Sequence, residues 1–119
     1  MTTKEIADQL VTYCRKVDWE GAHTNLYASN ARSIEPYETP DFPKTTEGLE
    51  AIRSKGKQFD AMVEKMHGID VSDPLVAGNS IAFRMEMDLT MKGKGRMKSP
   101  ELCVYQVQDG KIVSEEFFV

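Results

Sequence analysis

The sequence predicts one α+β domain, with helices in the first half of the chain and an antiparallel sheet in the second half. Before about residue 68, most apolar residues recur every three or four positions, as in helices that pack on a core. After that point apolar and polar residues alternate, as in strands that are covered on one face. Helices followed by a run of hairpin-linked strands are typical of helices packed on one face of an antiparallel sheet.

Three helices are predicted. A capping box at residues 2–5 begins an amphipathic helix of about four turns. Asp18 is placed to cap a second, short helix. Thr45 or Thr46 begins the third and longest helix, which Gly68 is expected to end.

The strands follow from alternation and from turn residues. A short strand is expected at 31–35, before a loop with three prolines at 36–43. The clearest alternation begins at Ser80 and predicts a long strand with six apolar residues on one face. The next strand covers about 97–107, where Pro100 predicts a bulge or bend.

The Asp109-Gly110 pair predicts a tight hairpin, and residues 111–119 form the last strand. No linker or repeat divides the chain, so residues 1–119 are expected to form a single domain. A chain of this length buries a core without disulfides or metal.

Charge and composition exclude several classes of partner. With 15 basic and 19 acidic residues the net charge is −4, which argues against nucleic acid. No apolar stretch approaches the roughly 20 residues that a membrane span needs, and no signal peptide is visible. Cys14 and Cys103 lack metal-binding spacing and are expected to be buried free thiols, so we predict a cytoplasmic protein.

Three stretches of the chain resemble one family. They are Asp18-Trp19-Glu20 with Leu26-Tyr27-Ala28 and Ser33-Ile34-Glu35-Pro36; then Thr46-Glu47-Gly48-Leu49-Glu50-Ala51-Ile52; and Glu101 to Tyr105 with the closing hairpin from Asp109 to Phe118. In order and spacing they resemble the SnoaL-like family of the nuclear transport factor 2-like superfamily, which is related to ketosteroid isomerase. The resemblance covers nearly the whole chain.

This resemblance implies a cone: a curved antiparallel sheet wrapped around the N-terminal helices, the cystatin-like roll. Cones of this superfamily commonly hold a small apolar molecule, and dimers through the sheet are common. Some members are cofactor-free isomerases, dehydratases or cyclases, and others have no catalytic activity. The fold therefore indicates where a site would lie, and not what it does.

Four residues are candidates for acid–base chemistry. Glu35 is either a carboxylate at the cavity mouth or a solvated one, and His67 either a base or a helix-terminal partner. Glu101 and Tyr105 share an apolar strand face, so Glu101 is expected to be buried and Tyr105 to donate to a ligand oxygen or simply to pack.

Other residues are predicted to line the cavity or to pack in the core: Tyr13, Trp19, Tyr27, Phe59 and Phe117. Asp88 is also a candidate lining residue, although strand alternation favours the outer face. Lys55 is expected in solvent. Glu115 and Glu116 face opposite sides of the last strand, and alternation does not decide which of them points inward.

The sequence and the family resemblance are compatible with two functions. The first is cofactor-free acid–base chemistry on a small apolar carbonyl compound, with Glu35 or His67 as base and with Tyr105 and protonated Glu101 as hydrogen-bond donors. The second is a non-catalytic homodimeric domain for ligand binding or assembly. With only two histidines and no glycine-rich phosphate loop, the sequence predicts neither a metal nor a cofactor.

Overall fold

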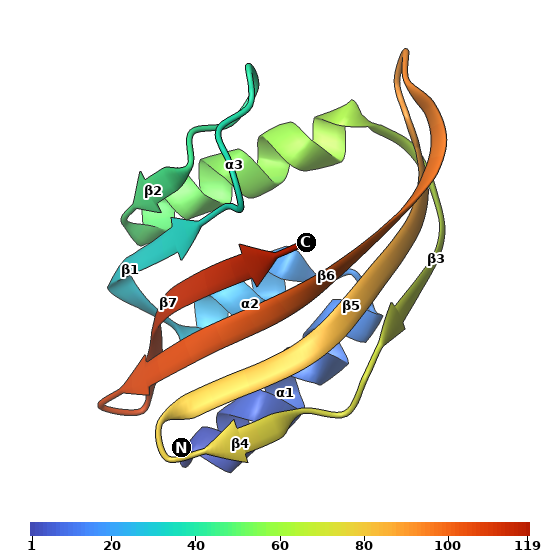
Figure 1. The fold of residues 1–119 in the computed structure, drawn as a ribbon. Helices are drawn as coiled ribbons and strands as arrows, with labels where there is room; N and C mark the ends of the chain where they lie inside the picture. The colour runs from blue at the N-terminus through green and yellow to red at the C-terminus, as the bar shows by residue number, and fades with distance from the viewer.

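The computed structural model describes all residues, 1–119, as three helices and one curved sheet (Figure 1). In chain order the elements are α1 (Thr3–Arg15), α2 (Trp19–Leu26), β1 (Tyr27–Ile34), β2 (Thr45–Glu47), α3 (Leu49–Met62), β3 (Val63–Val71), β4 (Leu75–Ala77), β5 (Ser80–Met91), β6 (Gly95–Gln108) and β7 (Lys111–Phe118). The predicted α+β class is confirmed.

The seven strands form one open, mixed sheet. Along the sheet the order is β2-β1-β7-β6-β5-β3, and β4 pairs with β5 beside β3. The long strands β5 and β6 bend strongly, and the helices lie on the concave side, as a cone requires (Figure 1). The prediction of a purely antiparallel sheet is wrong for one pair: β1 runs parallel to β7, with Ser33 opposite Glu115. All other strand pairs are antiparallel.

The core lies between the concave face and the helices. The apolar side of β5 faces inward as predicted, and its partners on β6 are Cys103 and Tyr105. From α1, Ile6 and Leu10 are among the completely buried side chains. This packing fixes the position of the helices against the sheet, because apolar area removed from water is the main source of stability.

The first two helix starts are confirmed. Thr2 and Glu5 form the reciprocal capping box of α1, and the Asp18 side chain accepts a hydrogen bond from the backbone of Gly21 at the start of α2. In each case a side-chain oxygen satisfies a backbone N–H that has no partner within the helix.

Both predicted ends of the third helix are wrong. Residues 45–47 pair with β1 as strand β2, and Gly48 then turns the chain with a φ of 90°, which only glycine adopts at little cost. At the other end, α3 stops at Met62, and residues 63–71 pair with β5 as strand β3. Val63, Met66 and Ile69 are half-buried at a spacing of three, because the pairing of β3 with β5 shifts register twice in this stretch. This spacing imitates a helical period, so periodicity alone misplaced the boundary.

The hairpin predicted at Asp109-Gly110, after β6, is present, whereas a bulge at Pro100, within β6, is not. Asp109 and Gly110 both have positive φ, 53° and 74°, as in the type I′ turn that matches strand twist. Pro100 makes no bulge: it pairs with Glu86 without a register shift. Pairing between β6 and β7 begins only at Leu102, so Pro100 has a strand on one side alone, where a missing N–H is tolerated.

Each of the three helices is too short or too polar to span a lipid bilayer.

The first prediction concerns the core. Leu10→Ala should lower the free energy of unfolding by about 2–5 kcal/mol, because it leaves a cavity at a side chain that is 1% exposed. Leu75→Ala, at a position 76% exposed, is the matched control and should change it by less than about 0.5 kcal/mol. Urea denaturation of both variants measures the difference; equal losses would contradict this placement of the core.

Candidate functional site

An internal cavity of about 320 Å³ lies between the helices and the concave face of the sheet. Its wall is mostly hydrophobic and comes from all three helices, from the loop after β1 and from β5, β6 and β7. Seven aromatic side chains line it: Trp19, Tyr27, Tyr37, Phe42, Phe59, Tyr105 and Phe117. Such a concave apolar space with a few polar groups is the usual form of a small-molecule site.

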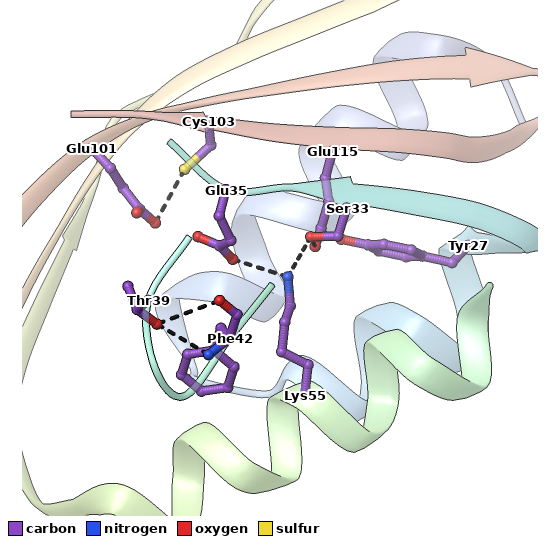
Figure 2. Close-up of polar contacts among 9 residues, drawn as sticks. All are labelled: Tyr27, Ser33, Glu35, Thr39, Phe42, Lys55, Glu101, Cys103 and Glu115. Atoms are coloured by element: carbon purple, nitrogen blue, oxygen red, sulfur yellow. Dashed lines mark hydrogen bonds and ion pairs between the residues drawn. The ribbon is translucent and has the colours of Figure 1, made fainter. Parts of the chain in front are cut away.

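A connected polar network crosses this apolar wall (Figure 2). The Lys55 ammonium donates to Glu35 Oε1 at 2.9 Å and to Ser33 Oγ at 2.6 Å. Ser33 Oγ donates to Glu115 Oε2 at 2.7 Å, and the Tyr27 hydroxyl donates to the other oxygen of Glu115. Every member has a partner, as buried polar groups require.

The local structure explains how these residues meet. The parallel register of β1 and β7 sets Ser33 opposite Glu115, and the last residue of β1, Ile34, leads directly into Glu35. Helix α3 lies across from this strand pair, and Lys55 extends from it to Ser33 on β1 and to Glu35 just after β1 (Figure 2). The network therefore exists only once the first third of the chain, α3 and the last strand have assembled.

Sequence reasoning missed Lys55 and left Glu115 undecided. Lys55 was expected in solvent, but its side chain is only 14% exposed. It follows Ile52 by three positions and precedes Phe59 by four, so it lies on the buried face of α3, and this spacing was the available signal. Glu115 is 5% exposed and lines the cavity.

Glu101 is a cavity carboxyl with a pKa raised toward neutrality. Burial in the apolar wall raises its pKa to about 7, and the negative charges of Glu35 and, more weakly, Glu115 act in the same direction. The thiol of Cys103, 3.7 Å away, and the Lys55 ammonium act in the opposite direction. A carboxyl of this kind exchanges a proton easily near pH 7.

Tyr105 presents a hydroxyl to the cavity. Its ring stacks on Phe83 with centroids 5.4 Å apart, and the residue is 3% exposed. The only fully enclosed side-chain polar atoms without a partner belong to Thr46 and Arg53, so the unpaired Tyr105 oxygen must be open to the cavity. Burial raises the pKa of Tyr105, so the hydroxyl stays protonated and able to donate.

The structure brings most of the predicted residues together. Glu35, Glu101 and Tyr105 all line the cavity. The aromatic residues predicted for its wall that do line it are Trp19, Tyr27, Phe59 and Phe117.

Three predicted residues lie elsewhere. His67 is exposed on β3 rather than at a helix end, and its Nε2 pairs with Thr90 Oγ1 at 2.7 Å. Asp88 lies outside the cavity, where two 2.9 Å hydrogen bonds from Arg96 lower its pKa. Tyr13 packs beside the core, and its hydroxyl accepts from Asn25 Nδ2 at 2.9 Å.

His23 is a cavity residue that the sequence did not indicate. It is 8% exposed, meets the Tyr27 ring edge-to-face at 4.9 Å, and burial lowers its pKa, so it is neutral at pH 7. The thiol of Cys14 is also part of the wall; burial raises its pKa to about 12, so it is not a nucleophile. No three His, Cys, Asp or Glu side chains gather as a metal site would require.

Comparison with known proteins agrees with this architecture. One similar crystal structure is that of a Mesorhizobium loti protein, described both as a candidate SnoaL-like polyketide cyclase and as a carbohydrate phosphatase. The two chains are 32% identical over 100% of both, with a TM-score of 0.92. A candidate isomerase of Bacillus subtilis is 21% identical over 98% of this chain and 88% of that one, with a TM-score of 0.76.

A Catenulispora acidiphila protein of ketosteroid isomerase-like fold, in complex with trimethylamine, is 18% identical over 99% of this chain and 87% of that one, with a TM-score of 0.75. At their low identities the last two relatives show the fold alone. No curated protein matches the chain at a significant level.

The curved sheet over three helices is thus the nuclear transport factor 2-like, ketosteroid isomerase-like fold. Within it, the SnoaL-like domain matches residues 1–119, and the chain belongs to that family.

The second prediction concerns Glu101. Its side-chain carboxyl should titrate at about pH 7. Glu35→Gln should lower the titration midpoint of Glu101, because the substitution removes the like charge with the largest effect on it. Burial should still keep the midpoint above the ordinary 4.5. Lys55→Met should raise the titration midpoint of Glu101, because it removes a positive charge that favours the ionised carboxylate. Glu64→Gln, an exposed carboxylate on β3, is the control and should leave it unchanged. Carboxyl ¹³C NMR titration measures each midpoint, and a wild-type midpoint near 4.5 would contradict the described environment.

Proposed function

We propose that the cavity binds a small, largely apolar carbonyl compound and catalyses cofactor-free proton transfer on it, as in an isomerisation, dehydration or cyclisation. The observation that carries the proposal is Glu101, a half-buried carboxyl whose pKa of about 7 suits proton transfer, in the same apolar cavity as two hydrogen-bond donors. The cavity volume suits a molecule of modest size.

Glu101 acts as the base in this proposal. Its ionised carboxylate takes a proton from the carbon next to the substrate carbonyl, and the C–H electron pair becomes the C=C bond of an enolate. The same carboxyl then returns the proton to a different carbon or to a leaving oxygen. A base must be ionised to act, so the rate rises with pH through about 7 and is constant above it.

Tyr105 and Lys55 stabilise the enolate oxygen. The Tyr105 hydroxyl has no partner in the protein and is free to donate to that oxygen. Lys55 supplies a positive charge that Glu35 and Ser33 hold in place. Donors fixed before the reaction stabilise developing charge without reorganising. Glu35 therefore positions Lys55, a different role from the base that the sequence indicated.

The third prediction tests this chemistry. Exchange of the α-hydrogens of 2-indanone in D₂O, followed by ¹H NMR, should be faster with the protein than with buffer alone. Glu101→Gln should reduce the protein-dependent rate by about 100-fold or more, because it removes the base. Tyr105→Phe should reduce it less and leave folding nearly intact.

Glu64→Gln is the control with the same chemical change on the outside, and it should keep the wild-type rate. If the wild-type protein exchanges no faster than buffer at pH 8 although NMR shows the ketone bound, the protein is a binding domain and catalysis is refuted.

We also propose a homodimer formed through the convex face of the sheet. Leu102 on β6 and Phe118 on β7 lie opposite each other in register, and each is 46% exposed. Both point away from the cavity, since the neighbouring Cys103 and Phe117 point inward. Adjacent large apolar side chains on a sheet face favour association.

The buried free thiols also support the reducing cytoplasm as the proposed location.

The fourth prediction concerns this face. Light scattering during gel filtration should give a dimer mass for the wild-type protein at about 50 µM. Leu102→Glu should give a monomer, because it places a charge in the apolar patch, whereas Gln9→Glu on the exposed side of α1, away from the convex face, should stay dimeric. A monomeric wild-type protein would refute the proposed dimer and leave the cavity proposal intact.

A further inference from the structure

The cavity contains more negative than positive groups. Three carboxyl groups line it, those of Glu35, Glu101 and Glu115, against a single ammonium, that of Lys55. His23, the other titratable base in the wall, is neutral at pH 7 because burial lowers its pKa. With all carboxyls ionised the lining charge is 1 − 3 = −2.

The hydrogen bonds show where this excess charge lies. Lys55 is held by Glu35 and Ser33, so its charge is largely compensated by Glu35. Glu115 receives two hydrogen bonds from neutral hydroxyls, which stabilise it without neutralising it. Glu101 has no cation in ion-pair contact, and its one hydrogen bond is from the Cys103 thiol. Glu101 and Glu115 thus both lack a positive partner, but both oxygens of Glu115 accept hydroxyl hydrogen bonds, whereas Glu101 has only the weak contact with the thiol.

The wall beside Glu101 suits an organic cation. Phe117 is opposite Cys103 in the β6–β7 register, two residues from Glu101. The Lys55 ammonium already lies 6.0 Å from the centre of the Phe117 ring, within the range of a cation–π contact. Tyr105, on the same strand as Glu101, and Phe42, in the loop after β1, also line the cavity.

We infer that the ligand of this cavity carries a protonated or quaternary amine, which lies between Glu101 and the aromatic wall. The inference rests on the proposed function and narrows its substrate class to an amine-bearing carbonyl compound. An anionic ligand would meet an excess of like charge, and a purely neutral one would leave the charge of ionised Glu101 without a partner.

Proton linkage follows from the surroundings of Glu101. The charged and titratable groups that face it are Glu35 after β1, Lys55 on α3, Glu115 on β7, Cys103 on β6 and the neutral thiol of Cys14 on α1, while β5 contributes the apolar Met85 opposite it. A cation added beside these groups favours the ionised form of Glu101. Binding of a cation therefore releases a proton from Glu101 near pH 7, and affinity rises with pH.

A pair of isosteric probes tests the inference. Phenyltrimethylammonium and tert-butylbenzene differ only in a nitrogen cation in place of a carbon. NMR chemical-shift titration at pH 6 and pH 8 gives the dissociation constant of each. The cation should bind about tenfold more tightly at pH 8 than at pH 6, as expected for a carboxyl that titrates near pH 7 when free and stays ionised in the complex. The neutral probe should bind no better at pH 8.

Variants assign the effect to Glu101. Glu101→Gln should abolish the pH dependence of the cation and weaken its binding at pH 8 by about tenfold, while tert-butylbenzene binds this variant at least as well as wild type. Glu64→Gln should behave as wild type with both probes.

Two outcomes overturn the inference, and they differ in what they say of the proposed function. If tert-butylbenzene binds and the cation binds more weakly at both pH values, the cavity takes neutral apolar ligands, and only the amine is refuted. If neither probe shifts the signals of cavity residues, the apolar binding site itself is refuted.

Discussion

The parallel pairing of β1 with β7 is the contact on which the rest of the site depends. It joins the first strand of the chain to the last, with Ser33 opposite Glu115 and Ile34 opposite Glu116. Because β2 pairs with β1, and the chain from β2 continues into α3, this pairing also places the helix that provides Lys55. Without it the polar groups of the cavity would be distributed over separate segments of the chain.

The polar network is costly to bury, and its completeness explains how the fold tolerates it. Removing a carboxylate or an ammonium from water costs several kcal/mol unless it is paired and hydrogen-bonded. Glu115 and Lys55 meet this condition through Ser33, Tyr27 and Glu35. Glu101 does not, and its pKa rises instead. The same physical rule thus separates groups that hold the site together from the group able to exchange a proton.

The two faces of the sheet differ in the side chains that they present. The concave face combines apolar side chains with the few carboxyls and hydroxyls that chemistry requires. On the convex face, Asp88 pairs with Arg96. Farther along the sheet, the exposed side chains of Leu102 and Phe118 lie opposite each other in register. The proposed catalysis and the proposed association therefore use opposite faces of one sheet, since adjacent residues on a strand face opposite sides.

The sequence by itself determined the α+β class, the caps of α1 and α2, the hairpin at Asp109-Gly110 and the inward face of β5 and β6 with Glu101 and Tyr105. These features depend on local propensity and on periodicity, which are written in neighbouring residues. Only the tertiary structure decided that Glu115 points inward, that Lys55 is buried beside Glu35 and that His67 lies on a strand outside the cavity. These outcomes depend on which distant segments pair, as β1 does with β7 and β3 with β5, and contacts of that kind leave no periodic signal in the chain.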